Sequence, residues 1–274
     1  DSRAVPASMA GQLRGGLSLA LGGFAYWSHD IGGFFGKASP GLFKRWIGFG
    51  LLSSQSRLHG AETYRVPWVF DDESVVVLRQ FIELRHRLLP YFETLELIAS
   101  TEGTPVMRPM LLEFPGDPAC HTLDRQYMLG PSLIVAPVFD PGPSGECSFY
   151  LPAGTWTDWW TGREVAGGQW YCEERGYADP PLFAREGAII PLAPDGRSLE
   201  DDRAEDMEIW LFRPREGSQL TLVASGAQVS LTVSRRDAGL VLETDGDLTG
   251  ARVAIAGSSF TAELGSRDSM TLPT

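Results

Sequence analysis

The sequence predicts an α/β region followed by an all-β region, and three observations lead to this fold class. In residues 1–103, apolar runs that end in turn signals alternate with segments of helical apolar spacing. Residues 104–198 contain short apolar runs separated by proline, glycine and aromatic residues. In residues 199–274, apolar and polar residues alternate within short runs. We therefore expect three domains with these bounds.

The first region opens with a predicted strand and a predicted helix. The apolar run 19–30 is long for a strand, but turn signals bound it, and it leads into the glycine loop 31–34. A helix is expected to start at Ser39 and Pro40, because proline is favoured in the first helical turn. The apolar residues of this helix share one face, and they are Phe43, Trp46, Ile47 and Leu51.

A second strand and a long helix complete this region. Residues 56–59 are expected to form a short strand or the end of one. The acidic residues Asp71, Asp72 and Glu73 then open a long helix, since negative charge is favourable at a helix N-terminus. Pro90 lies inside the predicted helix and is expected to kink it.

This alternation of strand and helix is typical of a parallel α/β barrel or a doubly wound sheet. Only two such units are present, so we expect the closed sheet to be incomplete within this chain. A partial parallel sheet would expose unpaired strand edges, which soluble proteins avoid. The sequence also begins with Asp1 instead of Met. We therefore expect a missing N-terminal segment of the same protein to supply the remaining strands.

The last region is predicted to be an antiparallel β-sandwich. Its apolar residues have period two, and turns separate the runs at intervals of roughly 8 to 12 residues. The predicted strands are 219–224, 228–233, 240–244 and 252–256. The acidic stretch 197–206 precedes them and is expected to be a solvated linker.

Charge and cysteine content narrow the range of partners and compartments. The net charge is −12, from 35 acidic and 23 basic residues. Such a surface repels nucleic acid and anionic membrane, so we expect neither as a partner. No apolar run reaches the roughly 18 residues that a membrane span needs. The three cysteines, Cys120, Cys147 and Cys172, form no C-x-x-C motif, and their odd number favours a reducing, cytoplasmic location.

Candidate functional residues lie where the two predicted strands end. Functional side chains of parallel α/β folds gather at the C-terminal ends of the strands. The first strand brings His29 and Asp30 to this rim, and the second brings Arg57 and His59. Charged groups at such a rim can satisfy the hydroxyl groups of a sugar.

Two aromatic residues, Trp27 and Phe34, would give this polar pocket apolar walls against a sugar ring. Taken alone, the residues leave other interpretations open. Asp30 can cap a turn, and His59 can be a hydrogen-bonded core histidine. No ligand spacing supports a metal site, and no nucleotide-binding motif is present, so we expect no metal and no cofactor.

A series of longer motifs runs along residues 1–192. They are Trp27–Phe34 (WSHDIGGF), Lys44–Trp46 (KRW), Ser56–Gly60 (SRLHG), Met107–Met110 (MRPM), Asp124–Gly130 (DRQYMLG), Val135–Val138 (VAPV) and Leu151–Gly162 (LPAGTWTDWWTG). In this order they resemble glycoside hydrolase family 31, and most of all its bacterial α-xylosidase branch. The resemblance implies the C-terminal part of a (β/α)8 barrel followed by two β-sandwich-type domains.

The resemblance also assigns roles to single residues. Asp1 precedes a segment with Ser-Met and Leu-Arg-Gly-Gly, as the general acid/base of the family does. His59 resembles the family histidine that hydrogen-bonds the hydroxyl groups of the bound sugar, and Phe34 the aromatic wall beside that sugar. Asp30 resembles a buried carboxylate that orders the pocket, with Arg57 as its neighbour on the last strand.

The implied reaction is hydrolysis with retention through a covalent glycosyl-enzyme, which requires two carboxyl groups roughly 5 Å apart. In the family, the nucleophile is an aspartate on an earlier strand, upstream of this chain. We therefore expect an oligosaccharide as substrate and no activity from these 274 residues alone. In the resemblance, the SHDIGGF form of the motif favours an α-xyloside over an α-glucoside. The physical rationale is that Phe34 would crowd the hydroxymethyl group that xylose lacks.

Three alternatives remain open at this point. A carbohydrate-binding module could use Trp156, Trp159 and Trp160 as a stacking platform, whereas tryptophans packed in a β-turn are the simpler interpretation. The first region could be barrel packing without catalytic residues. An α-glucosidase or a transglycosidase would share much of this scaffold. The oligomeric state is also open, a homo-oligomer included.

Overall fold

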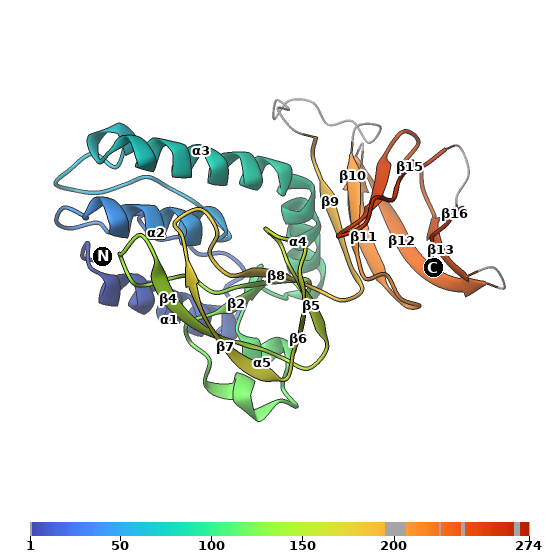
Figure 1. The fold of residues 1–274 in the computed structure, drawn as a ribbon, viewed down its shortest axis with the longest axis horizontal. Helices are drawn as coiled ribbons and strands as arrows, with labels where there is room; N and C mark the ends of the chain where they lie inside the picture. Colours follow the sequence, from blue (N-terminus) through green and yellow to red (C-terminus); the bar gives the residue numbers. More distant parts are fainter. Residues whose placement is uncertain (1, 195–206, 225, 237–238, 266–268, 274) are drawn as a thin grey trace.

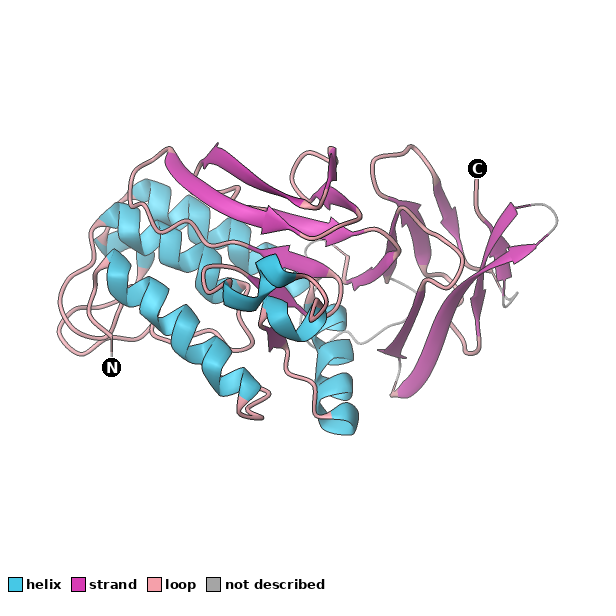
Figure 2. Cartoon of the chain, turned by 90° about the horizontal axis from the view of Figure 1, so that it is seen from below, coloured by secondary structure: helices cyan, strands magenta, loops and turns pink. Residues whose placement is uncertain are grey.

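The computed structural model describes residues 2–194, 207–224, 226–236, 239–265 and 269–273. Helices gather at the N-terminal end of the molecule, and a region made of strands alone forms the C-terminal end (Figure 1, Figure 2). The helices are α1 (Pro6–Leu21), α2 (Pro40–Leu51), α3 (Asp72–Arg87), α4 (Leu89–Glu102) and α5 (Met110–Glu113), with short 3-10 helices η1 (Pro67–Val69) and η2 (Pro118–Thr122). Among the described helices, none is long and apolar enough to cross a membrane.

The strand predicted for residues 19–30 is wrong, because α1 extends to Leu21 and irregular backbone follows it. The apolar residues of α1 have helical spacing, so Leu13 and Leu17 are buried while Leu19 is exposed. The extended part is reduced to an isolated parallel bridge between Asp30 and Arg57. A parallel strand needs neighbours that continue its hydrogen-bond ladder, and this bridge joins only two short segments.

Helix α2 begins where its signals place it. The hydroxyl of Ser39 accepts a hydrogen bond from the Leu42 amide at 3.2 Å, and Pro40 occupies the first turn. The helix is buried on all sides, including Lys44 and Arg45. Arg45 donates to the carbonyl oxygens of Asp140 at 3.0 Å and Gly142 at 2.7 Å, so it ties the helical region to the following domain.

The long helix predicted from residue 71 is two helices. Asp71 caps α3, since its carboxylate accepts from the Ser74 amide at 2.7 Å. The helix ends at Arg87, and Pro90 lies in the first turn of α4, which takes a different direction from α3 (Figure 1). The change of direction expected near Pro90 is therefore present, but as a break between two helices and not as a kink inside one. Proline lacks the amide that a continuous helix needs, and the first turn of a helix does not use that amide.

The middle region is a six-stranded sheet with a separate two-stranded sheet. The six-stranded sheet has the order β1-β2-β3-β8-β5-β6, and β4 pairs antiparallel with β7. Their bounds are β1 (Met107–Arg108), β2 (Tyr127–Leu129), β3 (Leu133–Val135), β4 (Gly145–Leu151), β5 (Thr155–Asp158), β6 (Glu164–Ala166), β7 (Gln169–Arg175) and β8 (Leu182–Arg185). Buried rings of Trp156, Phe149 and Phe183 lie in one core cluster of this region.

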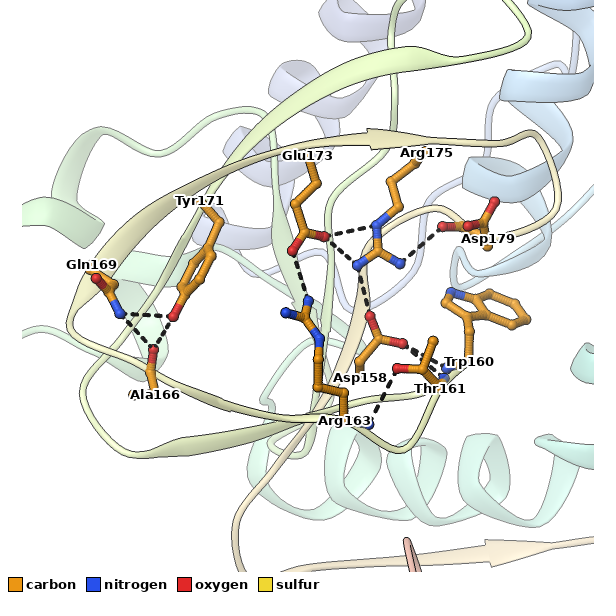
Figure 3. A network of polar contacts seen from close by, with 10 residues as sticks. All are labelled: Asp158, Trp160, Thr161, Arg163, Ala166, Gln169, Tyr171, Glu173, Arg175 and Asp179. Atoms are coloured by element: carbon orange, nitrogen blue, oxygen red, sulfur yellow. Dashed lines mark hydrogen bonds and ion pairs between the residues drawn. The ribbon is translucent and has the colours of Figure 1, made fainter.

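A buried ion pair joins β5 to β7 in this region (Figure 3). Arg175 Nη2 lies 2.7 Å from Asp158 Oδ2, and Arg175 Nε donates to Glu173 at 2.9 Å. The other oxygen of Asp158 accepts from the amides of Trp160 and Thr161 at 3.0 and 3.1 Å. Both buried charges are therefore paired and hydrogen-bonded, which a buried ion pair requires.

The described part of the C-terminal region forms two four-stranded sheets, with orders β15-β14-β10-β9 and β11-β12-β13-β16. Their bounds are β9 (Ala188–Leu192), β10 (Glu208–Phe212), β11 (Gln219–Ala224), β12 (Ala227–Arg236), β13 (Gly239–Thr244), β14 (Arg252–Ile255), β15 (Thr261–Glu263) and β16 (Ser269–Thr271). Buried residues of both sheets form one apolar cluster.

All four strands predicted in the C-terminal region are present, as β11 to β14. The expectation of purely antiparallel pairing was wrong, because β10 and β14 are parallel. Strand β9 lies before the predicted boundary at residue 199 but pairs with β10 after it. The predicted linker 197–206 lies outside the described residues.

Candidate active site

A buried carboxylate and a half-exposed guanidinium form the centre of the candidate site. Asp30 is 4% exposed, and its Oδ1 lies 2.6 Å from Nε of Arg57, whose side chain is 55% exposed. The parallel bridge between the two residues fixes their backbones, since Ile31 also donates its amide to the Arg57 carbonyl at 3.2 Å. The two bridged segments therefore place an ion-paired carboxylate and guanidinium side by side.

An aromatic ring and an imidazole form a second pair of neighbouring side chains in the candidate site. The ring of Phe34 is partly buried, and its centroid is 5.5 Å from that of the exposed His59. Phe35 packs edge-on against Phe34 at 4.6 Å. This arrangement presents an apolar ring beside a hydrogen-bonding group, which suits a sugar.

The glycine loop that carries Phe34 is held by the first described residues of the chain. The carbonyl oxygen of Ser2 accepts from the amides of Phe34 and Phe35, both at 2.9 Å. Gly33 has φ +80°, and its Cα approaches the backbone of Ala4 so closely that a Cβ would lie 2.7 Å from the Ala4 nitrogen. The position after Asp1 is thus fixed to the Phe34 loop, while Asp1 itself lies outside the described residues.

Arg65 supports the same loop, and the sequence analysis did not identify it. Its buried guanidinium donates to the carbonyl oxygens of Gly33 at 2.7 Å and Gly36 at 2.8 Å. Burial lowers the pKa of Arg65, and the nearby Asp30 and Glu62 oppose that shift. Arg65 also donates to the carbonyl and the hydroxyl of Thr63. Because its partners on the Phe34 loop are backbone carbonyls, no motif of side chains marks this role.

His29 lies in the core, away from the rim where the sequence placed it. Its Nδ1 accepts from the Trp46 indole at 2.8 Å, its Nε2 lies 3.1 Å from the Ser53 hydroxyl, and its ring stacks on Phe49. Burial, with a smaller effect of Arg57, lowers the pKa of His29 to about 3. The imidazole is therefore neutral and structural, with both nitrogens engaged.

Trp27 is also placed in the core. Its indole packs on Gly16 of α1 so closely that a Cβ at Gly16 would lie 2.0 Å from it, and only 8% of the residue is exposed. Its backbone exchanges two hydrogen bonds with the Ser54 hydroxyl. The structure does not bring Trp27 to the Phe34–His59 contact, and its role in substrate binding stays a prediction.

Comparisons with known proteins place this geometry in a family. Residues 1–95 match the description "Glycosyl hydrolases family 31 TIM-barrel domain", and residues 103–190 match "Glycosyl hydrolase family 31 C-terminal domain". Together the two matches cover more than half of the chain. The chain belongs to glycosyl hydrolase family 31.

Several members of family 31 are similar to the chain. An alpha-xylosidase of Emericella nidulans is 42% identical over 213 residues, which are 73% of this chain and 27% of that protein. An alpha-xylosidase of Lactiplantibacillus pentosus is 40% identical over 249 residues, 87% of this chain and 32% of that protein. The chain thus spans about a quarter to a third of the length of these relatives.

A solved structure also shares the fold. The cycloalternan-forming enzyme of Listeria monocytogenes, in complex with a pentasaccharide substrate, superposes with a TM-score of 0.84 at 25% identity. The match covers 93% of this chain and 26% of that enzyme. The predicted membership of family 31 is therefore confirmed, and with it a TIM-barrel part followed by the family's C-terminal domain.

Of the residues that the family resemblance selects, the structure groups Asp30 with Arg57 and Phe34 with His59. Their roles toward a sugar stay predictions, as does the acid/base role of Asp1.

The three tryptophans that could form the stacking platform of a carbohydrate-binding module, Trp156, Trp159 and Trp160, are not exposed. Trp156 is 1% exposed and donates to the Pro152 carbonyl at 2.8 Å, and Trp160 donates to the Pro180 carbonyl at 2.7 Å. Trp159 is partly buried and stacks on Trp210 with the ring centroids 5.7 Å apart. These three residues are packing residues, so the structure favours the simpler interpretation.

Replacing Gly33 by alanine is expected to lower kcat/KM of the complete protein by about tenfold or more. A Cβ there meets the Ala4 and Arg3 backbones at 2.7–2.8 Å, which would separate the Phe34 loop from residues 2–4. Positive φ itself costs an L-residue about 1–2 kcal/mol. Gly36→Ala is the matched control, since φ is +81° and the nearest atom is 4.0 Å away. Equal losses in both variants would contradict the importance of the close approach.

Proposed function

We propose that the protein containing this chain is a retaining α-glycosidase that removes terminal α-xylosyl residues from an oligosaccharide. The observation that carries the proposal is the contact of Ser2 with the Phe34 loop, which holds the residue after Asp1 beside Phe34, the proposed aromatic wall of the pocket. Membership of family 31 and two alpha-xylosidase relatives support the same activity.

Asp1 would act as general acid and then as general base. It protonates the leaving oxygen while a carboxylate nucleophile attacks the anomeric carbon, and it later deprotonates the water that hydrolyses the glycosyl-enzyme. Asp30 is unsuited to the nucleophile's role, because its buried carboxylate is ion-paired with Arg57. It would order the pocket, and the nucleophile would come from a strand outside these 274 residues.

The same proposal accounts for the incomplete pairing in the first region. Among the described residues 2–103, the β pairing within this region consists of the isolated parallel bridges Arg3–Phe35 and Asp30–Arg57. Further strands would complete a (β/α)8 barrel, with two β-sandwich-type domains after it. No catalytic step of this kind needs a metal or cofactor, and we propose a cytoplasmic location.

Substrate preference can be tested with 4-nitrophenyl α-D-xyloside and α-D-glucoside on the complete protein. We expect kcat/KM for the xyloside to be at least about tenfold higher, the discrimination that steric exclusion of one small group provides. Phe34→Ala should reduce this ratio, whereas Phe24→Ala, at a ring that is 57% exposed and lies outside the Phe34 loop, should preserve it. Equal kcat/KM values for the two substrates in the unmodified protein would rule out the preference.

An α-glucosidase or transglycosidase is the second candidate, favoured by the similarity to the cycloalternan-forming enzyme. Product analysis separates them. Free xylose supports the proposed hydrolase, while longer oligosaccharides indicate transfer.

A further inference from the structure

A groove of about 610 Å³ lies outside the candidate active site, between the helical region and the C-terminal domain of the family. One wall is the first turn of α1, with Pro6 and Ala7, and another is the loop 122–126. The third wall is the two-stranded sheet of β4 and β7, with Glu146, Ser148 and Trp170. None of these residues takes part in the contacts of the Phe34 loop described above.

Trp170 presents an exposed indole at this groove. It lies on β7 and is 57% exposed, in contrast to the buried Trp46 and Trp156. Its partner on the neighbouring strand β4 is Tyr150, whose ring centroid is 5.7 Å away. Tyr150 is itself buried and donates its hydroxyl hydrogen to Asp117 at 2.9 Å. The indole is therefore supported by a fixed ring, as a stacking platform requires.

The polar side of the groove is also held in place. The buried side chain of Gln126 exchanges two hydrogen bonds with the Tyr150 backbone, at 2.7 and 2.8 Å, which fixes the loop to β4. The preceding Arg125 has its guanidinium 4.9 Å from the centroid of the Phe139 ring. Asp124 lies 2.7 Å from Arg14 of α1.

Strand geometry brings further polar groups to the indole. Residues directly opposite each other in an antiparallel pair lie on the same face, and so do residues two apart along one strand. Tyr150 and Trp170 therefore share a face with Ser148 and Glu146. An exposed indole, a hydroxyl, a carboxylate and a guanidinium thus line one groove.

This combination selects a neutral sugar. An aromatic ring packs on the apolar face of a pyranose, while carboxylate and guanidinium groups bind its hydroxyl groups. Three acidic residues, Asp124, Asp140 and Glu146, line the groove with Arg125, so an anionic ligand is repelled. We propose that this groove binds a sugar unit of a neutral oligosaccharide, as a binding site separate from the candidate active site. The use of a xylose-bearing glycan, xyloglucan, as a probe for this groove rests on the proposed function.

The site can be tested by affinity electrophoresis of the complete protein in gels that contain xyloglucan or soluble starch. Retardation of the unmodified protein is expected, and Trp170→Ala should weaken binding by at least about tenfold. Trp170→Phe, which keeps an aromatic face, should retain part of it. Trp68→Ala is the matched control, because Trp68 is 71% exposed on η1 and does not line the groove.

Activity on 4-nitrophenyl α-xyloside separates this proposal from the proposed function. Trp170→Ala should leave kcat/KM for this small substrate unchanged. Retardation without xyloside turnover would keep the groove and reject the proposed function. Absence of retardation in both gels, or an equal effect of Trp170→Ala and Trp68→Ala, would overturn the sugar-binding groove.

Discussion

Asp1→Asn in the complete protein is expected to lower kcat/KM for a natural xylosyl oligosaccharide by about 10²–10⁴-fold, the usual contribution of general acid–base catalysis. The amide cannot donate a proton to the leaving oxygen or accept one from water. A bell-shaped pH profile of kcat/KM should lose the limb that reports the acid. The neighbouring contacts of Ser2 use only its backbone carbonyl, so the substitution should leave the Phe34 loop intact.

The leaving group provides the internal control for this variant. An activated aryl xyloside needs little protonation, so Asp1→Asn should slow its first step far less than that of the natural substrate. Exogenous azide should then accelerate the turnover of the aryl xyloside, because it attacks the glycosyl-enzyme without general-base help. A loss of the same size for both substrates, without rescue by azide, would show that Asp1 has another role.

The helices could be predicted from the sequence where local signals determine them. Ser39 and Asp71 cap α2 and α3 through hydrogen bonds that span only three residues. Strands were predictable only where period two persists, as in β11 to β14. The strand predicted for residues 19–30 was wrong, because an apolar run does not distinguish a helix end from a buried strand. The single helix predicted through Pro90 was wrong, because the effect of a proline depends on whether it lies inside a helix or in its first turn.

The candidate site was predictable in part for a similar reason. Asp30 and Arg57 could be placed together, because parallel segments that end at one edge bring their last residues into contact. The support given by Arg65 could not be predicted, since it acts on the carbonyls of Gly33 and Gly36 through contacts that only the folded loop creates. The burial of Trp159 likewise depends on a ring 51 positions later in the sequence.

Arg175→Met is expected to lower the free energy of unfolding by about 3–5 kcal/mol, the cost of leaving a buried charge without its partner. Asp158 is 1% exposed and pairs with Arg175 at 2.7 Å. Its second oxygen keeps two amide hydrogen bonds, from Trp160 and Thr161, which should place the loss at the lower end of this range. Urea unfolding of the complete protein, followed by circular dichroism, measures the effect.

Arg163→Met supplies the matched comparison within the same network (Figure 3). Arg163 pairs with Glu173 at 2.9 Å, but its side chain is 56% exposed, so water replaces the lost partner and the expected cost is about 0–1 kcal/mol. The double variant Arg175→Met/Asp158→Asn removes both buried charges and should recover part of the loss. Similar losses for Arg175→Met and Arg163→Met would mean that burial does not decide the strength of this ion pair.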